Sequence, residues 1–211
     1  MPTQIYRMKD GTRVPSVTTI ISRFKESGGL VHWAWQLGCD GKDYRKVRDE
    51  AADAGTLAHA MVEAEIQGKL YQPDGYDTET IEKAHQAYKA YQEWKRQTQL
   101  RALETECPLV SEGHRFGGTL DAMFVQDKLS LGDWKTSNSI YPDYLVQLSA
   151  YSILWRENYP TLPITGGFHL LRFSKEGDFA HHWWGDLREA EEAFLLMRRL
   201  YDLMDKLKKR V

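Results

Sequence analysis

A short stretch near the middle of the chain combines apolar and polar residues over a length typical of a β-strand, in which successive side chains point to opposite faces. In residues 129–136 the alternation places Asp133 and Lys135 on the same face as two leucines. The apolar run 120–125 precedes this stretch, and the residues 126–128 between them are typical of a turn. The pattern therefore predicts a β-hairpin whose second strand carries charged groups on an otherwise apolar face.

The remaining apolar spacing predicts a helical first half of the chain and a mixed second half. We expect helices at residues 16–24, 31–37, 46–67, 78–100, 142–158 and 187–208, with a break at Gly28-Gly29. We expect strands at residues 102–111, 115–125, 129–136, 164–173 and 179–184. The predicted fold class is α/β (α+β mixed), with a central mixed β-sheet flanked by helices and a helical N-terminal segment.

Length and composition fit one folded unit. The chain has 211 residues, of which 42% are hydrophobic, and this is enough to bury a substantial core. We divide residues 1–211, a single domain, into a mainly helical part (1–100), a sheet core (102–185) and a C-terminal helix (187–208). No apolar run reaches the length of a membrane span, and the N-terminus lacks the order of a secretory signal. We therefore expect a cytoplasmic protein with no membrane partner.

Charged residues are grouped along the chain. The net charge of −2 is low for a nucleic-acid-binding protein, so the distribution matters more than the sum. One basic group lies close to Trp33, Trp35 and Tyr44 and consists of Lys42, Arg45, Lys46 and Arg48. Basic groups among aromatic rings suit a single nucleic-acid strand, whose bases stack while its phosphates meet cations. The alternative is that the two tryptophans pack into the core.

Three polar groups of the predicted hairpin suit metal-dependent cleavage of phosphodiester bonds. Asp121 lies in the first strand, and Asp133 and Lys135 lie in the second. Carboxylate oxygens are ligands of Mg²⁺ and Mn²⁺, and an ammonium group can orient water or stabilise developing charge. An isolated Asp-x-Lys is usually a solvated surface, but charges on an apolar strand face need a partner or a metal. Gly117-Gly118 indicates either a bulge or turn, or close approach of the backbone to a ligand.

Two predicted helices carry further polar pairs at a spacing of four. His59 and Glu63 lie on one face of the helix at 46–67, and Gln147 and Tyr151 lie on one face of the helix at 142–158. Taken alone, a helical histidine is more often packed or capping than a metal ligand, and a helical glutamate is more often solvated. The order of these groups along the chain changes that interpretation.

This ordered set, from His59 to Tyr151, resembles the PD-(D/E)XK nucleases of the RecB-like exonuclease type. Phage-encoded and mitochondrial genome-maintenance exonucleases are nearest in pattern, and residues 14–21 (Val-Pro-Ser-Val-Thr-Thr-Ile-Ile) are similar to a segment often found in them. The motifs cover under half of the chain, and the whole set is far more specific than any one member. The resemblance implies a restriction-endonuclease-like core.

The resemblance also implies a role for each residue of the set. The metal would be held by His59, Asp121, Asp133 and the carbonyl of Trp134. The catalytic groups would be Asp121, Asp133 and Lys135. Gln147 and Tyr151 would bind DNA. Glu106 would match an acidic residue of the first core strand, a role for which Glu104 and Glu112 compete, and Glu63 is a further candidate.

The implied activity is that of a Mg²⁺- or Mn²⁺-dependent deoxyribonuclease. It would act as an exonuclease on single-stranded or frayed DNA ends in replication, recombination or repair, in a bacterium or a phage-infected host cell. Some relatives hold an iron-sulfur cluster with four cysteines, whereas this chain has only Cys39 and Cys107, so we expect no cluster. The alternative is a noncatalytic nucleic-acid-binding or replication-accessory protein of the same fold. Retention of both carboxylates and the lysine favours the enzyme.

Overall fold

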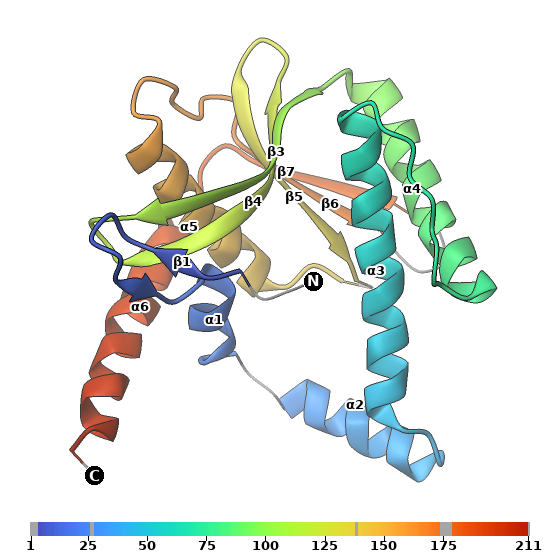
Figure 1. The fold of residues 1–211 in the computed structure, drawn as a ribbon, viewed down its shortest axis with the longest axis horizontal. Helices are drawn as coiled ribbons and strands as arrows, with labels where there is room; N and C mark the ends of the chain where they lie inside the picture. The colour runs from blue at the N-terminus through green and yellow to red at the C-terminus, as the bar shows by residue number, and fades with distance from the viewer. Residues whose placement is uncertain (1–3, 26–27, 138, 174–178, 211) are drawn as a thin grey trace.

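A five-stranded β-sheet crosses the middle of the molecule, with helices on both of its faces (Figure 1). The structure is a computed structural model that describes residues 4–25, 28–137, 139–173 and 179–210. In chain order the elements are β1 (Tyr6–Arg7), β2 (Arg13–Val14), α1 (Val17–Ser22), α2 (Gly28–Cys39), α3 (Tyr44–Ile66), α4 (Thr78–Thr98), β3 (Arg101–Ser111), β4 (Phe116–Val125), β5 (Leu129–Thr136), α5 (Pro142–Asn158), β6 (Phe168–Phe173), β7 (Phe179–Trp184) and α6 (Arg188–Lys208).

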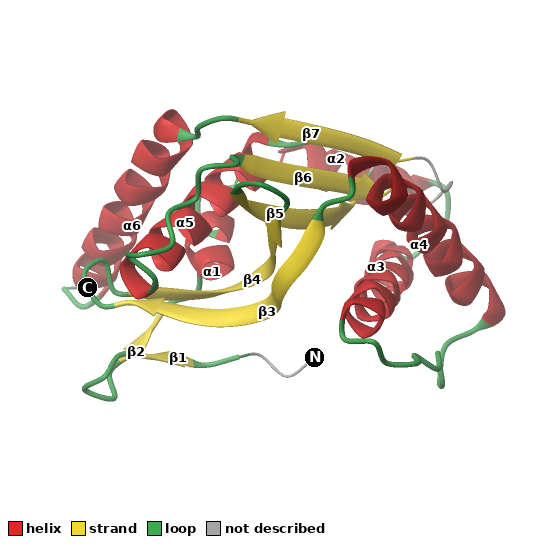
Figure 2. Cartoon of the chain, turned by 90° about the horizontal axis from the view of Figure 1, so that it is seen from above, coloured by secondary structure: helices red, strands yellow, loops and turns green. Residues whose placement is uncertain are grey.

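The strands lie in the order β3-β4-β5-β6-β7. Every neighbouring pair is antiparallel except β5 and β6, which are parallel with Asp133 opposite Leu170. A parallel pair requires a crossover connection, and α5 is part of that connection. Helix α5 therefore lies across one face of the sheet directly after the strand that carries Asp133 and Lys135 (Figure 2).

Each face of the sheet has its own hydrophobic cluster. Helices α1, α5 and α6 cover one face, where Leu131, Leu148 and Phe194 are buried. Helices α3 and α4 cover the other face, where Trp134 and Phe124 are buried. Leu131 and Trp134 of β5 lie in opposite clusters, as the alternation of side chains along a strand requires. The predicted fold class, a central mixed sheet flanked by helices, is confirmed.

Local sequence signals set the ends of several helices. Ser16, Asp43 and Asp77 are N-caps whose side chains accept hydrogen bonds from backbone N–H groups of the first turn. Gly68 follows the C-cap of α3 with φ of 65°, a conformation that glycine adopts without strain. Among the helices of the described ranges, none has both the length and the apolar character that a membrane span requires.

The structure differs from the sequence prediction at three places. The glycines Gly28 and Gly29, predicted as a break, form the start of α2, where the low helix propensity of glycine matters least. Strand β6 begins at Phe168, four residues later than predicted, because the preceding loop includes Gly167 with φ of 86°. Strands β1 and β2 were not predicted, since two-residue strands carry no periodic signal.

Replacing Phe124 by alanine tests the cluster beneath α3 and α4. Phe124 is 1% exposed, and its ring centroid lies 5.5 Å from Trp94 and 5.3 Å from Trp134. Removing a buried ring leaves a cavity, so we expect Phe124→Ala to lower the free energy of unfolding by about 3–5 kcal/mol. Urea unfolding followed by circular dichroism measures this change. Leu70→Ala, at a residue that is 99% exposed, is the control and should change it by less than about 0.5 kcal/mol.

Candidate active site

The two strand carboxylates lie where β4 and β5 separate. Backbone pairing of these strands ends at Ala122 and Gly132, and Asp121 and Asp133 are the next residues of each strand. Beyond this point β4 stays beside β3, and β5 stays beside β6, so the strands fan apart (Figure 1). The backbone N–H of Trp134 donates to Oδ2 of Asp121 at 3.1 Å. The side chain of Asp121 thus bridges the two strands at the fork.

Asp133 is completely buried, with 0% of its surface exposed. Its Oδ2 lies 2.5 Å from Nζ of Lys135, and its Oδ1 accepts a hydrogen bond from Nε2 of Gln147 at 3.3 Å. At this distance the ammonium of Lys135 is both the ion-pair partner and the hydrogen-bond donor of Oδ2. Burial raises the pKa of Asp133 to about 7, even though the charge of Lys135 opposes the shift. The carboxylate is therefore held by Lys135 and Gln147, and its burial still disfavours the charged form.

Lys135 lies on the same side of β5 as Asp133, as the strand alternation predicted. Burial alone would lower the pKa of Lys135, but the carboxylates of Asp133 and Asp121 outweigh it, and the net shift is upward. The amine therefore keeps its proton at neutral pH and serves as a cation rather than a base. Its Nζ also lies 5.3 Å from the ring centroid of Tyr144, a cation–π contact.

One face of α5 covers the carboxylates. Nε2 of Gln147 donates to the hydroxyl of Tyr151 at 2.8 Å as well as to Asp133. Tyr151 is 4% exposed, and burial raises its pKa well above the usual value, so the phenol stays protonated. The structure thus brings both predicted α5 residues to the site. It adds Tyr144, which lies three residues before Gln147 and seven before Tyr151 on the same helical face, a spacing visible in the sequence.

The glycine pair at the start of β4 makes room for two tyrosine rings. A Cβ on Gly118 would lie 2.8 Å from a ring carbon of Tyr151, and a Cβ on Gly117 would overlap the ring of Tyr6. The hydroxyl of Tyr6 also shares a hydrogen bond of 2.8 Å with Oγ1 of Thr119. The glycines therefore permit side-chain packing, which neither sequence interpretation, a bulge or a ligand contact, had considered. Tyr6 was missed because it comes from the short strand β1.

His59 reaches the site from α3. Burial lowers the pKa of His59 to about 4, and the charge of Lys135 acts in the same direction. The ring interacts with the backbone of Trp134 through a hydrogen bond and is neutral at physiological pH, which is the form that binds metals. Gly55, one turn earlier, allows this approach, since a Cβ there would overlap Oγ1 of Thr136 at the end of β5.

Glu106 is the acidic residue of β3 that lies near the carboxylates. The β3–β4 register places it across from Asp121, and its φ of 49° is in the left-handed region that non-glycine residues rarely adopt. Burial raises the pKa of Glu106, and the charges of Glu63 and Asp133 add to the effect. Glu63 of α3 thus lies close enough to act on Glu106 electrostatically.

The two competing glutamates lie elsewhere. Glu104 is exposed, and Glu112 is an exposed residue whose carboxylate accepts a hydrogen bond of 2.9 Å from the backbone of Lys9. Of the three glutamates that the sequence offered for this strand, Glu106 is therefore the one whose electrostatic environment includes Asp133.

The sequence matches the family model of the PD-(D/E)XK nuclease superfamily over residues 5–209. The chain belongs to this superfamily. Family membership supports a nuclease function, and PD-(D/E)XK nucleases generally use divalent metal ions. No curated protein matches the sequence.

Solved structures with a similar fold include nucleases. A candidate exonuclease from Eubacterium rectale is 12% identical, with 72% of this chain and 68% of that chain covered and a TM-score of 0.50. The alkaline exonuclease LHK-Exo from Laribacter hongkongensis is 14% identical, with 76% of this chain and 92% of that chain covered and a TM-score of 0.36. LHK-Exo in complex with dAMP is 12% identical, with coverages of 77% and 92% and a TM-score of 0.36.

The donor set of this PD-(D/E)XK site fits a divalent ion by its chemistry. It combines the carboxylate oxygens of Asp121 and Asp133, which act on each other electrostatically, with a neutral imidazole on His59. In the part of the chain that the structure describes, no three His, Cys, Asp or Glu side chains already lie close enough to hold an ion. The ammonium of Lys135 is the positive charge that faces Asp133 in this arrangement.

The predicted single-strand surface lies on α2 and the start of α3. Trp33 is 36% exposed and Trp35 is 63% exposed, and neither belongs to a hydrophobic cluster of the described residues. Core packing, the alternative interpretation of these tryptophans, is therefore wrong. The guanidinium of Arg45 lies 5.7 Å from the ring centroid of Tyr44.

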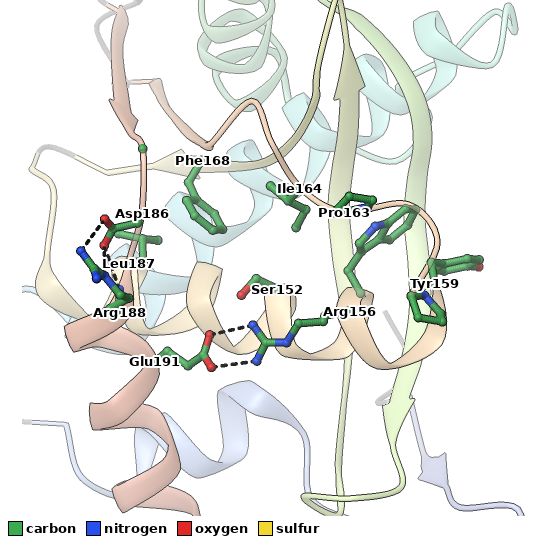
Figure 3. A pocket seen from close by; sticks show the side chains of 13 residues that line it. Ser152, Arg156, Tyr159, Pro163, Ile164, Phe168, Asp186, Leu187, Arg188 and Glu191 are labelled. Atoms are coloured by element: carbon green, nitrogen blue, oxygen red, sulfur yellow. Dashed lines mark hydrogen bonds and ion pairs between the residues drawn. The ribbon is translucent and has the colours of Figure 1, made fainter.

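A pocket between α5 and α6, with a volume of about 300 Å³, contains none of the predicted site residues (Figure 3). Its charged groups are paired with each other. Arg156 makes two hydrogen bonds with Glu191, at 2.8 and 3.3 Å, and Arg188 pairs with Asp186 at 3.2 Å. The Arg156–Glu191 pair links α5 with α6, whereas the Arg188–Asp186 pair lies at the start of α6.

The burial of Asp133 predicts how the stability of the protein depends on pH when a chelator keeps metal ions out of the site. A carboxyl whose pKa is raised from 3.8 to about 7 on folding binds a proton more tightly in the folded state. Its contribution to stability is therefore present below about pH 4 and is lost as the pH rises to about 7. We expect Asp133→Asn to remove this loss, so that the stability of the variant falls less steeply than that of the wild-type protein as the pH rises.

Chemical unfolding of both proteins with a chelator present, between about pH 5 and about pH 8, measures the difference in slope. Asp127→Asn is the control, because Asp127 lies in the exposed turn of the same hairpin. Equal slopes for the wild-type protein and Asp133→Asn would show that the buried charge is fully compensated.

Proposed function

We propose that the chain is a metal-dependent deoxyribonuclease that acts as an exonuclease on single-stranded or frayed DNA ends in replication, recombination or repair, as one nuclease domain. The observation that carries the proposal is the buried Asp133 carboxylate beside Lys135 and Asp121 at the fork of the sheet. A buried ion pair contributes little to stability compared with an apolar pair of similar volume. Strongly perturbed ionisable groups are typical of functional sites.

We assign His59, Asp121, Asp133 and the Trp134 carbonyl as the groups that would hold Mg²⁺ or Mn²⁺. When bound, the ion supplies Lewis-acid stabilisation of the phosphate and lowers the pKa of a coordinated water. Hard oxygen ligands with one imidazole suit both ions, and nitrogen suits Mn²⁺ better. The neutral state of His59 and the buried carboxylate of Asp133 beside Asp121 support this assignment.

Lys135 acts as the catalytic cation in this mechanism. Hydrolysis joins a water oxygen to phosphorus and breaks one ester bond, so negative charge builds on the phosphate oxygens. An ammonium that keeps its proton donates hydrogen bonds to these oxygens and to the attacking water. The raised pKa of Lys135 supports this role, since a protonated amine is not a general base.

Gln147 and Tyr151 are assigned to DNA binding, with different tasks. Gln147 is partly exposed and is positioned to contact the substrate strand, whereas the buried Tyr151 holds the Gln147 amide through a hydrogen bond of 2.8 Å. Glu106 and Glu63 add negative charge near the carboxylates and would strengthen attraction for cations.

The preference for single strands rests on α2 and α3. The exposed Trp33 and Trp35 provide faces on which bases would stack, worth about 1–3 kcal/mol per base. Helix α3 begins beside the basic residues and carries His59 about 20 Å further along, at about 1.5 Å per residue. A single DNA strand that binds the aromatic surface and runs along α3 would reach the carboxylates with its free end.

Lys135→Ala tests the mechanism. The wild-type protein should degrade end-labelled DNA when Mn²⁺ is added, and the variant should be slower by about 10²–10³-fold because one transition-state donor is lost. Gel analysis of the labelled products gives the rates, and calorimetry should show that Mn²⁺ affinity is largely kept. Lys128→Ala, in the exposed turn of the same hairpin, is the matched control and should cut at the parental rate.

Two results would contradict this proposal. Cleavage by Lys135→Ala within a few-fold of the parent would make the lysine structural. Absence of metal-stimulated cleavage of any DNA or RNA by the wild-type protein would favour the noncatalytic nucleic-acid-binding protein instead.

The requirement for a free end is tested with covalently closed circular single-stranded DNA beside the same sequence in linear form. We expect rapid loss of the linear molecule and persistence of the circle, since a threaded strand must enter by its end. Trp35→Ala should slow degradation of single-stranded more than double-stranded DNA, because its exposed ring would stack on unpaired bases. Comparable degradation of both forms would instead indicate endonucleolytic entry.

A further inference from the structure

Helix α6 has an apolar face that nothing in the described structure covers. Leu196 is 61% exposed, Leu200 44%, Leu203 45% and Leu207 53%. They follow one another at spacings of four, three and four residues, which is the spacing of a coiled-coil seam. We call these four residues the leucine seam. An apolar stripe of this kind on an otherwise charged helix is typical of an interaction surface.

The leucine seam points directly away from the body of the protein. At about 100° per residue, its four side chains lie within an arc of about 60°. Phe194 and Arg198, which are 0% and 6% exposed, lie on the opposite side of the helix, where Phe194 joins the cluster with α1 and α5 and Arg198 bonds to the backbone of His114 and Arg115. The helix therefore has two apolar faces, of which this chain buries one.

Polar contacts fix the rotation of α6. Near its start, Glu191 pairs with Arg156 of α5 (Figure 3). In its middle, the guanidinium of Arg198 donates to the carbonyl of Arg115 at 2.9 Å. Near its end, Asp205 pairs with Arg23 at 2.8 Å. The seam is therefore held outward along its whole length by contacts that do not involve it.

The seam is complementary to itself when reversed. Glu192 precedes it and Arg210 follows it on the same side of the helix, both exposed. The N–H of Arg210 donates to the carbonyl of Leu207 at 3.0 Å, so the chain still follows the helical path there. Read in either direction, the order is one charged group, four leucines and one group of opposite charge.

We propose that α6 binds the α6 of a second copy of this chain, antiparallel, to form a two-fold symmetric dimer. Leu200 would lie opposite Leu203 of the second copy, Leu196 opposite Leu207, and Glu192 opposite Arg210. An isologous interface requires this reciprocity, in which every contact occurs twice. The acidic first turn and basic last turn of α6 also meet favourably in an antiparallel pair, and so do the two helix dipoles.

A hollow with a volume of about 520 Å³ lies beside the start of the seam and is lined by residues of α5 and α6. Its charged residues are three arginines and two glutamates, so the leucines and the Glu192–Arg210 pair, rather than this hollow, carry the proposal. Four leucines per chain form a small interface, so we expect association at micromolar rather than nanomolar concentrations.

Sedimentation equilibrium of the full chain over a range of micromolar concentrations tests the dimer. We expect the mass of two chains for the wild-type protein and of one chain for Leu200→Glu/Leu203→Glu. Leu103→Glu is the matched control, because Leu103 is 54% exposed on β3, and it should stay dimeric. A monomeric wild-type protein, or a dimeric double variant, would overturn the proposal. Because the seam is exposed, circular dichroism should show that all variants fold.

A charge exchange tests the antiparallel register. Glu192→Arg and Arg210→Glu should each raise the dissociation constant by roughly three- to thirtyfold, since two symmetric ion pairs are lost. The double exchange restores both pairs and should return the constant to that of the parent. If the double exchange is as weak as the single variants, the two residues do not meet and the register is wrong. DNA cleavage by the monomeric variant is a separate readout, so failure of the dimer leaves the nuclease assignment untouched.

Discussion

Burial of the Asp133 carboxylate is the constraint on which the arrangement of the site depends. A charge removed from water must be compensated by charge or hydrogen bonds, and β5 provides the first compensation through Lys135. The second comes from Gln147, which requires α5 to lie across that face of the sheet. The parallel pairing of β5 with β6 places α5 there, since it forces the chain to cross over between the two strands.

The elements with strong local signals could be predicted from the sequence. The bounds of β5 and α5 agree with the predicted ones, because strand alternation and Pro142 at the helix start are local features. Elements that form only by pairing with residues far away in the sequence could not be predicted. Strand β1 exists through its pairing with β2 and its contact with β4, and Tyr6 lies 113 positions from its hydrogen-bond partner Thr119.

The same distinction holds for the site. Alternation put Asp133 and Lys135 on one face, and helical spacing put Gln147 with Tyr151, so these pairs followed from the sequence. Tyr144 was missed although its spacing was visible. Glu106 was a candidate from the sequence, but the choice of Glu106 over Glu104 and Glu112 was not visible, because it depends on strand register and on a backbone conformation, φ of 49°, that no local pattern indicates.

Most residues of the site lie close to one another in the sequence, and this affects the order in which the site can form during folding. Asp121 bonds to the backbone of a residue 13 positions away, and Asp133 bonds to a side chain 14 positions away. Closing loops of this size costs little chain entropy, whereas His59 must arrive with α3 over a far longer connection. The carboxylates, the lysine and α5 can therefore come together as one early folding unit, onto which α3 docks later. The histidine is then the group whose position depends most on completion of the whole fold.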